Sequence, residues 1–174
     1  MKEIDRLFLG NKEFCSSKDT IGDISLDKRK ETSTYGQHPY AVVISCSDSR
    51  VIPEAIFHAG IGELFTIRTA GNTIGDNELA SIEYAVEHLN VPLVVVLGHT
   101  QCGAIHSAVN SHKGNFVNVI LDRIALSYKD NKDELEVTKL NVQYGVNYIK
   151  SKMNNKMTVI GMLYHIDTGE VEML

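Results

Sequence analysis

The sequence predicts an α/β fold in which a mostly parallel central sheet is flanked by helices. Two observations indicate this class. Apolar runs rich in β-branched residues recur along the chain, for example at 40–44 and 93–97, and strands that are apolar throughout are typical of sheets covered on both faces. Segments with helical periodicity alternate with these runs, which is the order found in parallel sheets.

The first 38 residues are expected to form an N-terminal helix and an arm ahead of the sheet. Apolar side chains at Ile4 and Leu7 favour an amphipathic helix over roughly residues 2–15. Residues 16–38 are mainly polar, which indicates an arm or loop with one short helix. Because the chain is of single-domain length and has no internal repeat, residues 1–174 are expected to form one domain.

Strands and helices are predicted in alternation through the rest of the chain. One helix carries Leu79, Ile82 and Val86 on a single face. Near the C-terminus, Asp167-Thr168-Gly169 is a turn sequence that indicates a β-hairpin. The expected order is strand 40–45, helix 52–58, strand 64–67, helix 79–89, strand 93–97, helices 102–109, 116–128 and 135–153, strand 157–163, and hairpin strand 171–174.

Composition excludes several classes of protein. The formal net charge is −5 and the one small basic cluster is Lys28-Arg29-Lys30, so a nucleic-acid partner is not expected. No apolar run approaches the roughly 20 residues of a membrane span, so no membrane association is expected. The charged start of the chain has no signal-peptide pattern, which favours the cytoplasm. In that reducing compartment, three cysteines indicate metal ligands, catalytic thiols or core residues rather than disulfides.

Two short segments carry the residues of greatest chemical interest. Cys46-Ser47-Asp48-Ser49-Arg50 follows the first apolar run, and His99-Thr100-Gln101-Cys102 follows the run at 93–97. Functional groups of open α/β sheets gather at the carboxyl ends of strands, so these segments are expected to meet. Two thiolates and an imidazole are ligands that zinc prefers, and three protein ligands leave a fourth position for water. The sequence therefore predicts a catalytic zinc site.

The carboxylate in the first segment has two possible roles. If the chain stays extended over 46–50, the side chains of Cys46, Asp48 and Arg50 point the same way. Asp48 then either binds zinc as a fourth ligand or pairs with Arg50 and leaves room for water. Zinc lowers the pKa of a bound water molecule, but two thiolates cancel its formal charge. Activity is therefore expected to rise toward alkaline pH.

The spacing of the second segment predicts how its ligands meet. His99 and Cys102 are three residues apart, which brings them together if a helical turn begins at His99. Gly98 and Gly103 flank the two ligands, and both are expected to let the backbone bend tightly. Cys15 lies far from both segments and is expected to pack beneath the N-terminal helix.

At these residues the chain resembles the β-class carbonic anhydrases, whose pattern is C-x-D-x-R followed by H-x-x-C. It looks like a compact, short-chain member with a plant-like active-site pattern. The resemblance implies that Cys46, His99 and Cys102 bind Zn2+ and that Asp48 and Arg50 form a catalytic pair. Supporting segments are Gly10-Asn11-Lys12, Arg68-Thr69-Ala70-Gly71-Asn72, Ser81-Ile82-Glu83-Tyr84-Ala85 and the Thr168-Gly169 hairpin.

The resemblance also implies substrate-binding roles for Gln37, Phe65, Tyr84 and Gly103. Gln37 matches a glutamine that hydrogen-bonds bicarbonate, whereas Phe65 and Tyr84 match residues that line the pocket, partly across a dimer interface. A homodimer or higher homo-oligomer is therefore implied. Each residue also has a plainer interpretation, because Gln37 alone reads as a loop residue, Phe65 as strand core and Tyr84 as a half-buried helix residue.

The function expected from this resemblance is reversible hydration of carbon dioxide to bicarbonate and a proton by zinc-bound hydroxide. The same site could instead hydrolyse carbon disulfide or carbonyl sulfide. A non-catalytic zinc protein is a third interpretation, although such a protein is expected to lack Asp48 or Arg50. A redox role has no C-x-x-C motif to support it, and nucleotide binding has no G-x-G-x-x-G. His106 is either a proton carrier or a surface helix residue.

Overall fold

The computed structural model describes residues 2–16, 21–130, 133–153 and 157–174, so residues 17–20 of the expected arm lie outside the described residues. A five-stranded sheet in the order β2-β1-β3-β4-β5 forms the centre of the molecule. Strands β1 to β4 pair in parallel and β5 joins β4 antiparallel, which confirms the expected class and C-terminal hairpin. The strands are β1 (Ala41–Cys46), β2 (Leu64–Thr69), β3 (Leu93–His99), β4 (Thr158–Tyr164) and β5 (Val171–Met173).

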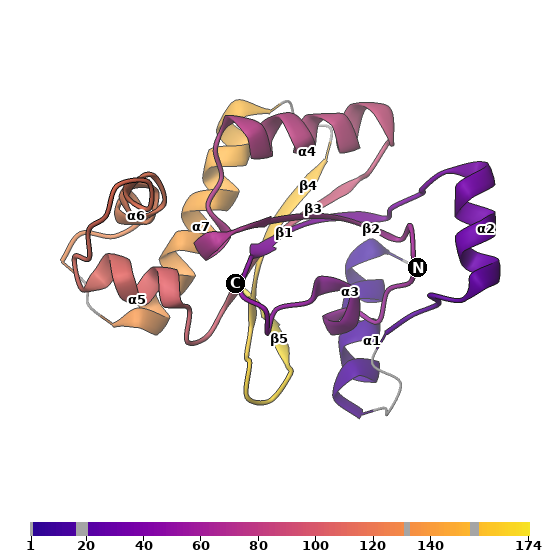
Figure 1. Cartoon of the computed structure of the whole chain (residues 1–174), viewed down its shortest axis with the longest axis horizontal. Coiled ribbons are helices and arrows are strands. Elements are labelled where there is room, and N and C mark those ends of the chain that lie inside the picture. Colours follow the sequence, from indigo (N-terminus) through magenta and orange to yellow (C-terminus); the bar gives the residue numbers. More distant parts are fainter. Residues whose placement is uncertain (1, 17–20, 131–132, 154–156) are drawn as a thin grey trace.

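Helices cover both faces of the sheet (Figure 1). Val42 and Ile44 of β1 share one core with α4 and α7, whereas Ala41 and Val43 share the opposite core with α1 and α3. This burial on both sides explains why β1 is apolar throughout. The helices are α1 (Glu3–Ser16), α2 (Leu26–Tyr35), α3 (Pro53–Ile56), η1 (Ala70–Asn72), α4 (Asp76–His88), α5 (Gly103–Val109), α6 (Asn118–Ala125) and α7 (Glu134–Lys152).

The N-terminal helix is tied to distant parts of the chain by one buried side chain. The Asn11 amide donates to the carbonyls of Ile56 and Gly169, and its oxygen accepts from the Val171 N–H. Cys15, in contrast, is exposed, so the expectation that it packs beneath the helix is wrong. In the last turn of α1 it is Phe14 that packs against the core.

The arm contains the one short helix expected from the sequence. Ser25 caps α2 by accepting a hydrogen bond from the Lys28 N–H at 3.1 Å. None of the described residues of α2 is buried, and the helix stands apart from the sheet in Figure 1. Elsewhere among the described residues, no helix has the length and apolar character needed to cross a bilayer.

Candidate metal centre and active site

The three expected metal ligands meet at the carboxyl edge of the sheet. Cys46 is the last residue of β1 and His99 is the last residue of β3, which pair in parallel. Cys102 precedes the first residue of α5. All three are buried, and their candidate ligand atoms lie within 4.8 Å of one another. Parallel pairing of β1 and β3 therefore brings together two residues that are 53 positions apart in the sequence.

A tight turn, rather than a helical turn, joins His99 to Cys102. β3 continues through His99 and α5 begins only at Gly103, so the expected helical turn at His99 is wrong. The Thr100 N–H donates to the Tyr164 carbonyl at 3.0 Å, and Gln101 adopts a left-handed φ of 56°. Glutamine seldom takes this conformation, so nothing in the residue type indicated the bend.

The two glycines beside the ligands do not make this bend, so that expectation is also wrong. Gly98 lies within β3, where a Cβ atom would come within 2.6 Å of Val142 Cγ2. It therefore allows α7 to approach the sheet closely. Gly103 begins α5, and a Cβ atom there would meet open space.

The hydrogen bonding of His99 leaves one ring nitrogen free to bind a cation. Nδ1 lies 2.9 Å from the Thr100 carbonyl oxygen, which can only accept, so Nδ1 carries the ring proton. Nε2 is then a bare lone pair, and it is buried with no hydrogen-bond partner in the described part of the chain. A metal ligand with its other nitrogen held by a carbonyl has this arrangement.

The two thiols have opposite electrostatic preferences. A hydrogen bond from Cys102 is the largest cause that lowers the pKa of Cys46 to about 4, and the neighbouring His99 imidazole and then the backbone N–H groups of Asp48 and Gly71, at 3.4 and 3.3 Å, lower it further. The same contact with Cys46, together with burial, raises the pKa of Cys102. Two thiolates this close repel each other, so both ionise only when a cation lies between them. The donor set fits a zinc ion.

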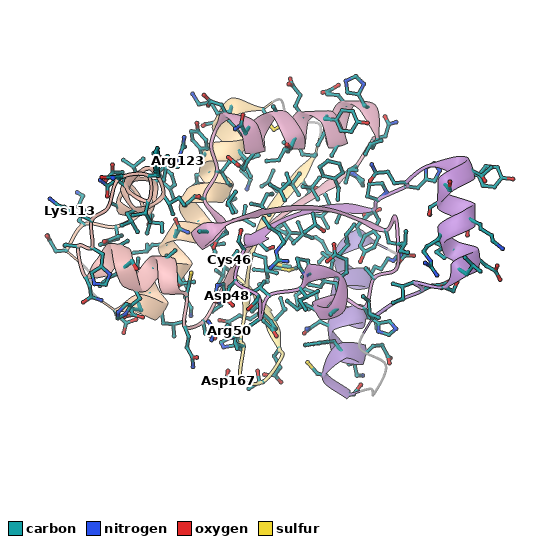
Figure 2. All side chains as sticks on the ribbon, viewed as in Figure 1. Cys46, Asp48, Arg50, Lys113, Arg123 and Asp167 are labelled. Atoms are coloured by element: carbon teal, nitrogen blue, oxygen red, sulfur yellow. The ribbon has the colours of Figure 1, made fainter. Side chains whose placement is uncertain are left out.

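Asp48 and Arg50 form a two-pronged ion pair beside these ligands. Asp48 Oδ1 accepts from Arg50 Nε at 2.9 Å, and Oδ2 accepts from Nη2 at 2.7 Å. Hydrogen bonds from Arg50 hold the pKa of the Asp48 carboxyl well below its usual range. Figure 2 shows Cys46, Asp48 and Arg50 following one another from the end of β1.

The backbone that carries this pair is not extended, which corrects the expectation for residues 46–50. β1 ends at Cys46, and a turn follows at Ser49-Arg50. The turn forms because the Arg50 N–H donates to Asp48 Oδ1 and the Val51 N–H donates to the Asp48 carbonyl. The turn, rather than strand alternation, places the guanidinium against the carboxylate.

Two arginines support the ligand segments through backbone carbonyls, and the sequence predicted neither of these contacts. Arg50 Nη2 also donates to the Gln101 carbonyl at 3.1 Å, so one side chain contacts both ligand segments. Arg68 donates to the carbonyls of Cys46 and Asp48 at 3.2 and 2.8 Å from the neighbouring strand β2. An arginine in a strand that borders a site is a sequence signal that could have indicated this role.

The other expected site residues lie elsewhere within a single chain. Gln37 is exposed and precedes β1, at the strand end opposite Cys46. Phe65 pairs with Val42 of β1, and its ring lies 6.2 Å from that of Tyr84, which is 48% exposed. Their substrate-binding roles stay predictions that require a second copy of the chain.

Gly103 and His106 both lie on α5, the helix that follows Cys102. Gly103 is next to Cys102, and its substrate-binding role also stays a prediction. His106 Nδ1 lies 2.7 Å from Glu134 Oε1 and the imidazole is more than half exposed. His106 therefore lies at the protein surface, and its role as a proton carrier stays a prediction.

Comparisons with known proteins agree with this fold. Residues 41–171 match the family model described as "Carbonic anhydrase". Carbonic anhydrase 2 of Mycobacterium tuberculosis is 35% identical over 178 residues, covering 92% of this chain and 86% of that protein. The carbonic anhydrase of Mycolicibacterium smegmatis is also 35% identical, covering 84% and 80%. The β-carbonic anhydrase CafA of Aspergillus fumigatus superposes with a TM-score of 0.73 at 28% identity, covering 85% and 81%.

These matches define an enzyme class, that of the carbonic anhydrases. The chain belongs to the β-class family of carbonic anhydrases. The family was expected from the two ligand segments, and it is confirmed.

Proposed function

We propose that this protein catalyses reversible hydration of carbon dioxide to bicarbonate and a proton at a zinc site held by Cys46, His99 and Cys102. The observation that carries the proposal is the buried His99 Nε2 lone pair, without a hydrogen-bond partner in the described chain and grouped with two cysteine sulfurs. Zinc bound by this set would supply a hydroxide nucleophile near neutral pH, because it acidifies a water molecule.

The protein's own residues then orient the reactants. Arg50 keeps Asp48 ionised, so this carboxylate can accept a hydrogen bond from the attacking nucleophile and direct its lone pair toward carbon dioxide. Arg68 fixes the backbone at Cys46 and Asp48, and Arg50 links the Asp48 carboxylate to the Gln101 carbonyl of the second ligand segment. This support keeps the carboxylate in one position through the reaction.

The substrate pocket is proposed to be completed by a second copy of the chain. Gln37, Phe65 and Tyr84 lie away from the zinc ligands of their own protomer. Gln37 and Tyr84 are exposed, whereas Phe65 is partly buried beside Tyr84. A β-carbonic anhydrase of Sordaria macrospora, one of two described as tetrameric, superposes with a TM-score of 0.74 at 26% identity. We therefore propose a homodimer or higher assembly. The proposed location is the cytoplasm, where reducing conditions keep Cys46 and Cys102 able to bind zinc.

The direct test is stopped-flow measurement of carbon dioxide hydration with a pH indicator, on protein whose zinc content is known. Activity that increases from neutral to alkaline pH is expected, because two thiolates reduce the charge that acidifies water. Cys102→Ser should lose zinc, as measured by elemental analysis. A zinc-containing protein without hydration activity at any pH would contradict the proposed reaction, and a zinc-replete Cys102→Ser variant would contradict the ligand set.

A further inference from the structure

Two successive hydrogen bonds connect a buried side chain of α7, that of Asn141, to the sulfur of Cys46. The Asn141 amide donates to the Gly71 carbonyl at 2.9 Å, and the Gly71 N–H donates to Cys46 Sγ at 3.3 Å. Asn141 is only 5% exposed, and no residue of α7 supplies a candidate zinc ligand. The buried amide therefore contacts the site through a glycine of η1.

The backbone at Gly71 can hold this position only because the residue has no side chain. Its φ of 66° lies in the left-handed region. A Cβ atom would come within 2.9 Å of Ile124 Cδ1 and 3.1 Å of Ala104 Cβ. The next residue, Asn72, is also left-handed, with φ 45°. Glycine and asparagine are the residues that adopt this conformation most readily, and Asn141 is the side chain that holds the Gly71 carbonyl.

We propose that Asn141 is a positioning residue that keeps the Gly71 N–H directed at the Cys46 sulfur, and so limits how much charge this sulfur donates to the metal. An N–H bond draws electron density from a thiolate, whereas a thiolate without it is a stronger donor. The inference rests on the proposed zinc site but concerns a residue that touches neither metal nor substrate.

The informative variant is Asn141→Leu, which keeps the size of the side chain and removes the donor. Replacing zinc by cobalt gives a sulfur-to-metal charge-transfer band that reports the donor strength of the cysteines. We expect this band to move to lower energy in the variant because the sulfur loses a hydrogen bond. Zinc affinity, measured by competition with a chelator, should fall about tenfold because the sulfur is no longer held in position for the metal. Asn141→Ser is a milder second variant, because it shortens a side chain that already borders a small cavity lined by Asn72 and Tyr144. The charge-transfer band and the zinc affinity are expected to change in the same directions.

Thr138→Val is the matched control on the same helix. Thr138 is 2% exposed, and its hydroxyl donates to the Glu134 carbonyl within α7. This variant removes a buried hydrogen bond about one turn from Asn141 without disturbing Gly71. Its charge-transfer band is expected to match that of the wild type. Equal bands in all the variants would overturn the proposal, as would an equal loss of zinc affinity in the control.

The experiment separates this inference from the proposed function. A wild-type cobalt protein without a thiolate charge-transfer band would contradict the zinc site itself. A normal wild-type band that is unchanged in both Asn141 variants would overturn only the role of Asn141. Neither readout requires turnover of carbon dioxide.

Discussion

At the scale of single residues, Arg50 is the side chain that contacts both ligand segments of the site. Two nitrogens of its guanidinium donate hydrogen bonds to the Asp48 carboxylate, and one of them also donates to the Gln101 carbonyl of the second ligand segment. Lysine could not replace it, because one ammonium group cannot form this planar fork. Arg50 therefore keeps Asp48 ionised and links the two ligand segments.

Asp48→Asn tests the role of this carboxylate. The side chain keeps its size, and the metal ligands are untouched, so zinc content should remain at the wild-type level. Hydration activity should fall by about 100-fold or more, because a neutral amide is a much weaker acceptor than a carboxylate for the hydrogen bond from the attacking nucleophile. Asp122→Asn makes the same chemical change at an exposed position on α6 and should leave activity unchanged. Full activity in Asp48→Asn would contradict the proposed role.

Tyr40 gives a pH-dependent contribution to stability that is separate from catalysis. Burial raises its pKa to about 12, and the Arg6 guanidinium lies 3.9 Å from the ring centre. In the unfolded chain the Tyr40 hydroxyl ionises near pH 10, so the folded protein holds the phenolic proton more tightly. The contribution is complete below about pH 10 and disappears as pH rises toward about 12.

Urea unfolding of the wild type and Tyr40→Phe across this alkaline range measures the effect. The free energy of unfolding of the wild type should fall more steeply with pH than that of the variant. The difference between the two slopes isolates Tyr40 from the lysines that titrate in the same range. Parallel slopes would show that Tyr40 ionises equally in the folded and unfolded chains.

At the scale of secondary-structure elements, α7 packs closely on the sheet because glycines leave room for it. A Cβ atom at Gly98 of β3 would lie 2.6 Å from Val142, and one at Gly161 of β4 would lie 2.7 Å from the same side chain. Val142 therefore projects into a space made by glycines on two neighbouring strands. This contact sets the depth of α7, and thereby the position of Asn141 relative to η1.

Gly98→Ala should destabilise the fold by about 1–3 kcal/mol, because the added methyl group overpacks a filled core. The test is a double-mutant cycle with Val142→Ala, measured by urea denaturation. Removing the Val142 methyl groups makes room for the new Cβ atom, so the two changes should be less destabilising together than the sum of each alone. A coupling free energy of about 0.5–3 kcal/mol is expected, and strict additivity would contradict this explanation.

The elements also show which features sequence patterns predict and which they do not. Apolar runs predicted the strands, and parallel pairing then required Cys46 and His99 to meet at one edge of the sheet. The turn at Gln101 and the left-handed pair Gly71 and Asn72 were not predicted. Their conformations depend on contacts with Tyr164 and Asn141, which are distant in the sequence. Patterns over a few residues carry no information about such contacts.

At the scale of the whole molecule, the metal ligands and the residues expected to line the pocket lie far apart within one chain. Phe65 pairs with Val42, four residues before Cys46, which corresponds to roughly 13 Å along the strand. β2 is an edge strand of the sheet, and Tyr84 of α4, whose ring lies 6.2 Å from that of Phe65 on β2, is 48% exposed. On α2, which stands apart from the sheet, Tyr35 is 74% exposed. The proposed second copy would contact these surfaces, and its side chains would complete the site.

Mixing two inactive variants tests whether the site is shared between chains. Asp48→Asn lacks the catalytic carboxylate, and Tyr84→Ala lacks a residue proposed to line the partner's pocket, so each homodimer should have low activity. After dissociation and reassociation of an equal mixture, half of the dimers are mixed, and each mixed dimer contains one complete site. About a quarter of wild-type activity should therefore return. Activity that stays at the average of the two variants would place Tyr84 in the site of its own chain or outside the site altogether.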